Sequence, residues 1–391
     1  MTRIALVASS YLPRFGGVEE HVYHLARELI RRGHTVTVWA VDQGDEPPSD
    51  TGGIPVRYLP VPMPNRSVGG MLRWAVRFPA AASKWRRAAR LDRPEVIDVQ
   101  CFGANGPYAL ALAERTGIPL VYSNHGETFM DAHGTFDTSS LMKSSLGRTL
   151  AAAAAVTSCS AYAAADLGRF GAAAPATIVG NGIDLDAPGA PIDAALPARY
   201  IAGVGRLVAN KGFDRLVAAY ADAVGRGLLA DVDLVLGGDG PERGELERLV
   251  RDLGVADRTT FTGALSRGQV RTLLDGAVAH VVPSLVEAFG IVVLEGWRSG
   301  VPVVVTDRGG PPEFVTDRVD GLLFDPDDRD ALAGLLVEID ADAALRARLG
   351  AAGRASAARF SWPAVADSYE AVFDAATRSP SPKDEEHTSD R

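Results

Sequence analysis

The sequence predicts an α/β protein made of two doubly wound domains, each a parallel sheet covered by helices. Short β-branched runs alternate with longer amphipathic stretches, a pattern typical of parallel strands joined by helices. A stretch rich in proline, glycine and alanine interrupts this alternation at residues 185–198, and the alternation then resumes. The length of 391 residues exceeds that of a usual single domain, which also favours two.

The first domain is expected to cover residues 1–184. A strand at residues 4–8 precedes a helical pattern at residues 18–32, which Gly33 ends. Further strands are predicted at residues 34–41, 96–99, 120–123, 155–158 and 177–179. Residues 185–198 are expected to form the interdomain linker.

The second domain is expected to cover residues 199–360. Its strands are predicted at residues 200–204, 232–236, 259–261, 278–282 and 303–306. A helix at residues 361–377 follows, and the tail at residues 378–391, rich in serine, proline and charge, is expected to be disordered. Ligands bind such sheets at the carboxyl ends of the strands, so we expect both domains to face one interdomain cleft.

The composition is that of a globular protein, with 47% hydrophobic and 23% charged residues. Two cysteines form no disulfide framework, and no apolar run is as long as a membrane span, so a cytoplasmic location is expected. The net charge of −9 argues against nonspecific nucleic-acid binding.

Two carboxylates separated by seven residues are the most informative motif. Glu287 lies in the loop after the strand at residues 278–282, and Glu295 lies in the second turn of the next helix. That helix begins near Phe289, Gly290 and Ile291, whose backbone N–H groups and helix dipole favour a bound phosphate. Because carboxylates accept hydrogen bonds from hydroxyls, the motif suits a ligand that contains both phosphate and sugar.

Arg206 and Lys211 form a second motif, in the loop between the first strand and first helix of the second domain. Two cations in such a loop can neutralise a diphosphate. A pair of solvated surface cations is the alternative. Gly238, at the end of the next strand, allows close approach of a base or a phosphate.

Two loops of the first domain are candidates for the opposite wall of the site. Gly16 and Gly17 follow the first strand and precede a helix, without the G-x-G-x-x-G spacing of a dinucleotide site. His125 follows the strand at residues 120–123 and can exchange hydrogen bonds with a sugar hydroxyl. An ordinary flexible turn and a structural loop histidine are the alternatives.

Together these motifs resemble those of the family-four retaining glycosyltransferases of the GT-B fold, over almost the whole chain. The run from Glu287 to Glu295 resembles the family's E-x7-E motif, and the segment from Gly205 to Gly212 resembles its G-R-L-x(n)-K-G motif. The resemblance implies two Rossmann-like domains and a nucleoside diphosphate sugar as donor. It also implies transfer with retention, without a cofactor, a catalytic metal or a protein base.

The resemblance further implies a role for each residue. Arg206 and Lys211 would bind the leaving diphosphate, Glu295 the nucleotide ribose and Glu287 the hydroxyls of the donor sugar. The resemblance also implies that His125 contacts the donor sugar, that the Gly16–Gly17 loop lies near the donor phosphates and the acceptor, and that the terminal helix returns to the first domain. The donor base, the sugar and the acceptor stay undetermined.

Two other functions are compatible with this pattern. Nucleotide-sugar epimerases share the two-domain architecture, and a non-catalytic nucleotide-sugar-binding protein could keep the same motifs. The D-x-D pairs at residues 231–233 and 325–327 stand apart from the phosphate motifs, so no catalytic metal is expected.

Residues 66–93 form a basic segment with interleaved aromatic residues, and Asp92 is its single acid. It resembles an interfacial helix that meets an anionic membrane, which would place the protein peripherally at the inner membrane face. A solvated helix packed through its aromatic residues is the alternative, and Pro79 weakens the membrane interpretation.

Overall fold

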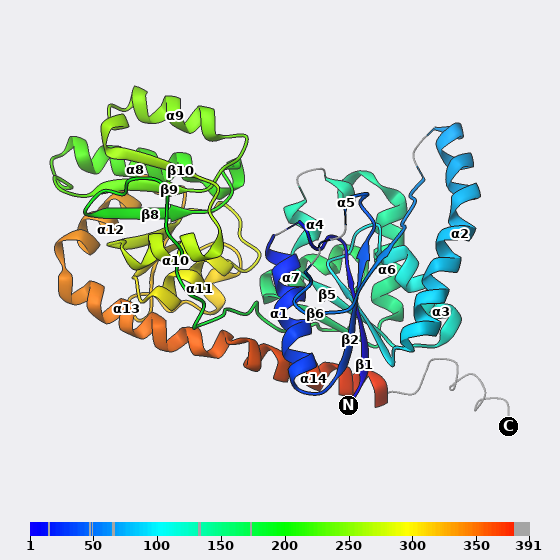
Figure 1. Cartoon of the computed structure of the whole chain (residues 1–391). Helices are drawn as coiled ribbons and strands as arrows, with labels where there is room; N and C mark the ends of the chain where they lie inside the picture. Colours follow the sequence, from blue (N-terminus) through cyan, green and yellow to red (C-terminus); the bar gives the residue numbers. More distant parts are fainter. Residues whose placement is uncertain are drawn as a thin grey trace. The chain divides into compact units, whose positions relative to one another are not determined.

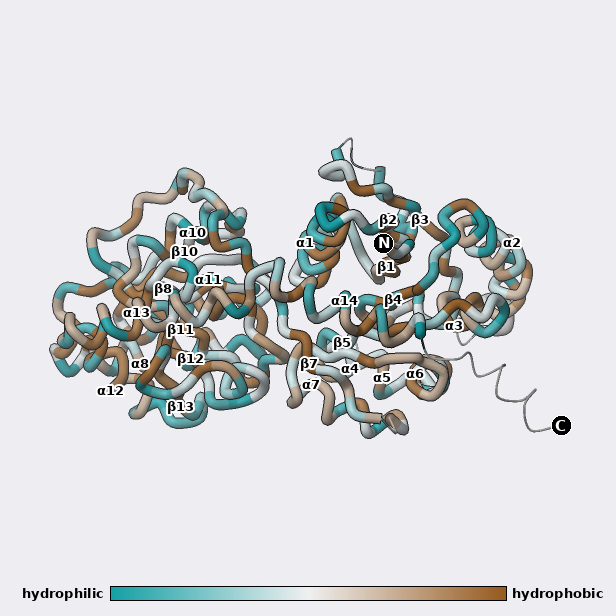
Figure 2. The backbone as a smooth tube through the Cα atoms, turned by 90° about the horizontal axis from the view of Figure 1, so that it is seen from below, coloured by the Kyte–Doolittle hydropathy of each residue, from teal (hydrophilic) through white to brown (hydrophobic). Residues whose placement is uncertain are grey.

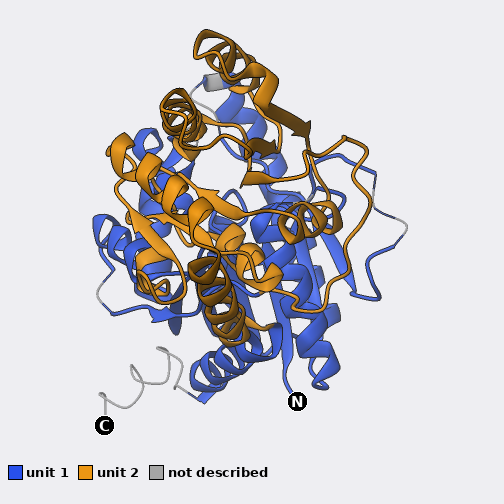
Figure 3. Cartoon of the chain, turned by 90° about the vertical axis from the view of Figure 1, so that its left-hand side faces the viewer, with its two compact units in different colours: residues 1–182, 362–391 blue, residues 183–361 orange. Residues whose placement is uncertain are grey.

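The computed structural model describes residues 1–14, 16–46, 48, 50–64, 67–131, 134–172 and 174–378. These residues form two compact units (Figure 3). Unit 1 contains residues 1–182 together with the chain from Trp362 onward, and unit 2 contains residues 183–361. Of the expected disordered tail, residues 379–391 lie outside the described residues, as does Arg66 of the basic segment.

Unit 1 contains a parallel sheet in the order β3-β2-β1-β4-β5-β6-β7 (Figure 1). Its strands are β1 (Arg3–Ala8), β2 (Thr35–Val41), β3 (Val56–Leu59), β4 (Val96–Gln100), β5 (Leu120–Asn124), β6 (Ala155–Ser158) and β7 (Thr177–Ile178). Its helices are α1 (Gly17–Arg31), α2 (Val68–Asp92), α3 (Gly106–Thr116), α4 (Glu127–Met130), α5 (Thr135–Thr138), α6 (Ser140–Ala152), α7 (Ala161–Asp166) and α14 (Trp362–Arg378).

The alternation along β1 explains why helices cover both faces of this sheet. Ile4 and Leu6 belong to a cluster that includes residues of α1 and α14, whereas Ala5 and Val7 belong to one that includes residues of α2, α3 and α6. Successive side chains of a strand point to opposite faces, so a doubly covered strand is apolar throughout. Figure 2 shows hydrophobic residues along the strands of both units, whereas α2 carries hydrophilic and hydrophobic residues together.

Unit 2 contains a second parallel sheet, in the order β10-β9-β8-β11-β12-β13. Its strands are β8 (Tyr200–Val204), β9 (Asp233–Gly237), β10 (Thr259–Gly263), β11 (Ala279–Val282), β12 (Val303–Thr306) and β13 (Leu322–Phe324). Its helices are α8 (Phe213–Gly225), α9 (Arg243–Asp252), α10 (Arg267–Asp275), α11 (Ile291–Ser299), α12 (Arg329–Ala341) and α13 (Ala343–Ala357). The strand order reverses beside β8, where doubly wound sheets bind their ligands.

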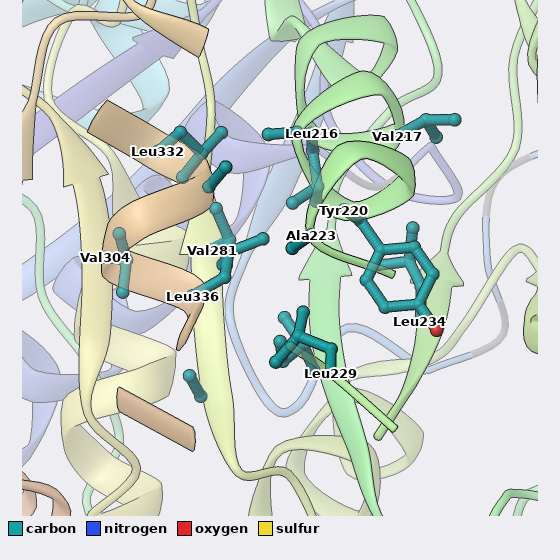
Figure 4. Packing of buried hydrophobic residues seen from close by; sticks show 14 of the residues in the cluster. Leu216, Val217, Tyr220, Ala223, Leu229, Leu234, Val281, Val304, Leu332 and Leu336 are labelled. Atoms are coloured by element: carbon teal, nitrogen blue, oxygen red, sulfur yellow. The ribbon is translucent and has the colours of Figure 1, made fainter. Parts of the chain in front are cut away.

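The main core of unit 2 lies between its strands and helices that include α8 and α12 (Figure 4). Leu216 and Ala223 of α8 point toward Val281 of β11, and Leu332 and Leu336 of α12 come in beside them. All five side chains are buried. This packing holds β8 and β11 rigidly, so the loops that follow them start from defined positions.

The chain passes between the units after residue 182 and after residue 361. The segment that follows each of these points packs within one unit. Ile192 and Leu196, within the stretch expected to be the linker, pack on a cluster of unit 2, and the Ala190 N–H donates to the Gly268 carbonyl at 2.9 Å. Helix α14 packs on α1 within unit 1. Arg32, which directly follows α1, binds this helix through carboxylates of Asp367 and Glu370.

Candidate active site

Four loops of unit 2 meet at the carboxyl ends of β8, β9, β11 and β12, and backbone hydrogen bonds join them. The Leu207 N–H donates to the Asp239 carbonyl, and the Leu285 N–H donates to the Asn210 carbonyl, each at 2.9 Å. The Gly310 N–H donates to the Glu287 carbonyl, also at 2.9 Å. Every predicted site residue of unit 2 except Glu295 lies in one of these loops or, like Ile291, at the first position of the helix that follows. The strand order therefore places these residues along the carboxyl edge of the sheet.

Arg206 lies in the loop after β8, which is packed tightly against the loop after β9. Gly238 has a φ of +141°, and a Cβ there would lie 1.9 Å from the Gly205 carbonyl oxygen. Only glycine therefore permits this approach. The Arg206 side chain is exposed, and none of the residues that the structure describes forms an ion pair with its guanidinium. It is therefore available to an anionic ligand.

Lys211 and Glu287 form the ion pair at the centre of this edge. The Lys211 ammonium lies 2.5 Å from Glu287 Oε2, and the Ser284 hydroxyl donates to the same oxygen at 3.1 Å. Gly212, at φ +65°, lets the two loops meet, because a Cβ there would lie 2.1 Å from the Pro283 carbonyl oxygen. Glu287 is buried, so the pair places a cation and a buried carboxylate side by side.

Helix α11 begins directly after Gly290, which adopts the left-handed conformation with φ +97°. The first N–H groups of such a helix have no intrahelical partner, so Ile291 and its neighbours offer backbone donors. The Phe289 side chain, in contrast, is buried, and its ring stacks on that of Phe314 with centroids 4.8 Å apart. Any contact of Phe289 with a donor would therefore come from its backbone.

Glu295 lies in the second turn of α11 and is buried, with only 5% of its surface exposed. Its Oε1 accepts a hydrogen bond from Arg267 Nη1 at 3.1 Å, across the contact between α10 and α11. We did not single out Arg267 from the sequence. The sequence signal for a site role of Arg267 was its position in the connection after β10, at the same sheet edge as the other site residues.

Gly16 and Gly17 lie at the start of α1 in unit 1, and both are exposed. Gly16 is extended, with φ −157° and ψ −174°, so its backbone conformation does not itself require glycine. A Cβ at Gly16 would lie 2.6 Å from Glu19 Oε2, the end of a flexible side chain. These two residues thus present an exposed backbone, without side chains, where the loop that follows β1 leads into α1.

His125 directly follows β5 and belongs to a buried polar chain. The Gln100 amide nitrogen donates to Asp98 Oδ2 at 2.6 Å, which turns the amide oxygen toward His125 Nε2 at 2.8 Å. An amide oxygen only accepts, so Nε2 must carry the proton and Nδ1 presents a lone pair. Burial lowers the pKa of His125 to about 4, so the ring is neutral near pH 7.

Glu127 holds the His125 loop in place. Its carboxylate accepts from the backbone N–H groups of Phe102, at 2.6 Å, and His125, at 2.8 Å, and from the Tyr122 hydroxyl at 2.8 Å. Burial raises the pKa of Glu127 above its usual value, and these hydrogen bonds oppose that rise. The sequence interpretation assigned no role to Glu127, Asp98 or Gln100, although an aspartate inside an apolar strand was a visible signal.

The structure thus brings Lys211 and Glu287 into direct contact and ties the Arg206 loop to the Gly238 loop. Glu295 contacts Arg267 instead of another predicted residue. Within the described part of the chain, no cluster of three metal-ligating side chains is found. Asp325 and Asp327, one of the D-x-D pairs, bind Arg308.

Comparison with known proteins identifies relatives of both halves of the chain. Residues 193–356 match the family model described as glycosyl transferases group 1, and residues 15–187 match that of glycosyltransferase family 4. A GDP-mannose-dependent alpha-(1-6)-phosphatidylinositol monomannoside mannosyltransferase of Mycobacterium tuberculosis is 30% identical over 382 residues, which cover 90% of this chain and 93% of the relative. A glycogen synthase of the same species is 30% identical over 407 residues, covering 96% and 95%.

Solved structures share this architecture over almost the whole chain. Sucrose-phosphate synthase from Thermosynechococcus elongatus has a TM-score of 0.77 at 24% identity and covers 96% of this chain and 98% of its own. Anabaena Alr3699/HepE in complex with UDP has a TM-score of 0.75 at 19% identity, covering 95% and 99%. These similarities confirm the predicted GT-B fold with two Rossmann-like domains.

Proposed function

The chain belongs to glycosyltransferase family 4, and from this premise we propose that it is a retaining, nucleotide-sugar-dependent hexosyltransferase. It moves a hexose or an N-acetylhexosamine from a nucleoside diphosphate sugar to a hydroxyl of a glycan, lipid-linked or natural-product acceptor. We place it in the cytoplasm, where such activated sugars are made. The observation that carries this proposal is the Lys211–Glu287 pair in the same group of loops as Arg206, whose exposed guanidinium has no ion-pair partner among the described residues.

In the proposed reaction, unit 2 holds the donor. Arg206, Lys211 and the N-terminus of α11 stabilise the diphosphate as negative charge develops on the leaving group. The diphosphate competes with Glu287 for Lys211, and Glu287 then accepts hydrogen bonds from the sugar hydroxyls. Glu295 binds the ribose, and its contact with Arg267 holds the carboxylate in position.

Unit 1 contributes a neutral imidazole in a fixed tautomer. Nδ1 of His125 accepts a hydrogen bond from a hydroxyl of the donor sugar, while Gln100 keeps the proton on Nε2. Because the ring stays neutral, we assign it an orienting role rather than proton transfer. The leaving phosphate accepts the proton of the acceptor hydroxyl, which requires no protein base.

The proposal is tested by incubating the purified protein with UDP- and GDP-linked glucose, mannose and N-acetylglucosamine. Release of the nucleoside diphosphate and a rise in unfolding temperature identify the donor. Incubation of that donor without acceptor separates the alternatives, because an isomerised nucleotide sugar would show an epimerase. Binding of every tested donor without turnover, when mixed with a panel of acceptors, would favour a non-catalytic protein.

Replacing Glu295 by alanine is expected to weaken binding of the donor nucleotide about tenfold or more, since a buried carboxylate that accepts from ribose hydroxyls is removed. Titration calorimetry with the nucleoside diphosphate measures this change. Glu295→Gln keeps the shape and should lose less affinity. Glu245→Ala, at an exposed position of α9, is the control. An unchanged dissociation constant for Glu295→Ala would contradict the ribose role.

We also propose that α2 brings the enzyme to an anionic membrane surface. The side of its first half that faces away from the core exposes Leu72 (67%) and Val76 (73%), flanked by exposed Arg73 and Arg77. Trp74 and Phe78 face the other way, and the Phe78 ring contacts Tyr108. Among the described residues no helix is both long and apolar enough to cross a bilayer. An exposed apolar stripe with arginines along one flank suits the plane of a membrane interface.

The membrane proposal predicts that the protein sediments with phosphatidylglycerol vesicles but not with phosphatidylcholine vesicles. Binding should fall in high salt, which screens the basic residues. Leu72→Asp and Val76→Asp should each reduce it several-fold without unfolding, because both side chains are exposed. The matched control is Val319→Asp, an exposed position of unit 2. Equal sedimentation of all three variants with wild type would refute the membrane contact.

A further inference from the structure

A pocket of about 420 Å³ lies beside α2 in unit 1, next to the basic segment at residues 66–93. One wall is α2, through Arg77, Ala80, Ala81 and Lys84. The other wall is Asp42, which directly follows β2, and residues 60–62, which directly follow β3. The pocket therefore opens at the carboxyl edge of the sheet, the edge at which doubly wound domains bind ligands.

The wall formed by residues 60–62 is held rigidly from behind. The Trp85 indole N–H donates to the Pro60 carbonyl at 3.1 Å, and the Tyr108 hydroxyl donates to the Pro62 carbonyl at 2.6 Å. The two aromatic rings stack with centroids 5.7 Å apart. Both proline carbonyls thus already accept hydrogen bonds from these aromatic side chains. Because proline also lacks an N–H, Pro60 and Pro62 offer a ligand no backbone donor.

Hydrogen-bond donors in this pocket come mainly from two cationic side chains. Arg77 and Lys84 are exposed, and neither forms an ion pair with any residue that the structure describes, Asp42 included. They are seven residues apart, two turns or about 10 Å along the helix, so their long side chains reach into the pocket from its two ends. With Asp42 as the single lining acid, the pocket is net cationic.

The pocket shares its sheet edge with the other loops of unit 1. The sheet order places β3 two strands from β1, whose loop carries Gly16 and Gly17. Two strand spacings are about 10 Å. A polar molecule held at Arg77 and Lys84 can therefore extend along the edge to the Gly16–Gly17 loop.

From this arrangement we propose that the pocket is an anion subsite, which binds the phosphate ester of the acceptor while the reacting hydroxyl lies toward the Gly16–Gly17 loop. A guanidinium and an ammonium are the donors that recognise phosphate oxygens. This inference rests on the proposed transferase function and specifies its acceptor as a phosphorylated molecule. The phosphate can belong to a lipid headgroup or to a water-soluble ester.

The test is titration calorimetry on the full chain with three probes: glycerol 1-phosphate, dihexanoylphosphatidylglycerol below its micelle concentration, and glycerol. Wild type should bind one or both phosphate probes and not glycerol. Arg77→Ala and Lys84→Ala should each weaken that binding about tenfold. Arg90→Ala, at an exposed α2 position outside the pocket, should leave it within about twofold of wild type.

Binding of the lipid probe alone would identify a lipid headgroup as the ligand, and binding of glycerol 1-phosphate alone a soluble ester. The inference is overturned if neither phosphate probe binds, or if Arg90→Ala weakens binding as much as the two pocket variants. Titration with UDP and GDP runs in parallel. Nucleotide binding without probe binding would reject this pocket alone, and probe binding without nucleotide binding would reject the transferase proposal.

Discussion

Replacing Arg206 by alanine is expected to lower kcat/KM for sugar transfer on the order of a hundredfold, while the protein stays folded. The guanidinium is exposed and has no ion-pair partner among the described residues, so its removal breaks no ion pair there. Its proposed partner is the diphosphate, whose negative charge grows as the glycosidic bond breaks. Initial rates with the donor identified above, together with thermal unfolding, measure both expectations.

Arg251→Ala is the matched control for Arg206→Ala, since Arg251 is an exposed arginine of unit 2 in α9, outside the four site loops. Wild-type turnover in Arg206→Ala would remove this cation from the mechanism. Lys211→Ala is a less direct test, because it also leaves the buried Glu287 without its cation, and such losses destabilise proteins. Comparing Lys211→Ala with Lys211→Ala/Glu287→Gln separates lost catalysis from lost stability.

Asp98→Asn is expected to change how the stability of unit 1 depends on pH. Burial raises the pKa of Asp98 from 3.8 to about 7, although hydrogen bonds from Ser123 and Gln100 oppose the rise. Between pH 3.8 and about pH 7, the Asp98 carboxyl binds more protons in the folded chain than in the unfolded chain. Its contribution to stability therefore falls as pH rises through this window. The shift of about three pH units corresponds to about 4 kcal/mol.

The asparagine variant lacks this titration, so it should gain stability relative to wild type between pH 4 and pH 8. Urea unfolding at several pH values measures the difference in free energy of unfolding between the two proteins. The contributions of other titrating groups cancel in this difference. Parallel pH dependences would contradict the raised pKa.

A second consequence of Asp98→Asn concerns His125. The new amide can donate to Gln100, which would turn the Gln100 amide and move the imidazole proton of His125 to Nδ1. Transfer should then slow even where the variant is stable.

Helix and strand signals in the sequence predicted most of the architecture, and the exceptions have physical reasons. Val56–Leu59 and Leu322–Phe324 form β3 and β13, which were not expected. Both are short edge strands, so they carry too few residues for a periodic pattern, and β3 includes Arg57. Trp297 fills an aromatic cluster with Phe314 and donates its indole N–H to the Asp320 carbonyl.

The sequence by itself determined most of the strands and the turns after them, and therefore the loops that carry Arg206, Lys211, Glu287 and His125, because turn chemistry acts over a few neighbouring residues. Only the tertiary structure decided which side chains meet. Lys211 pairs with Glu287 across 76 residues, and His125 meets Gln100 across 25. Such contacts depend on which strands lie side by side in the sheet, and no local pattern along the chain encodes that order.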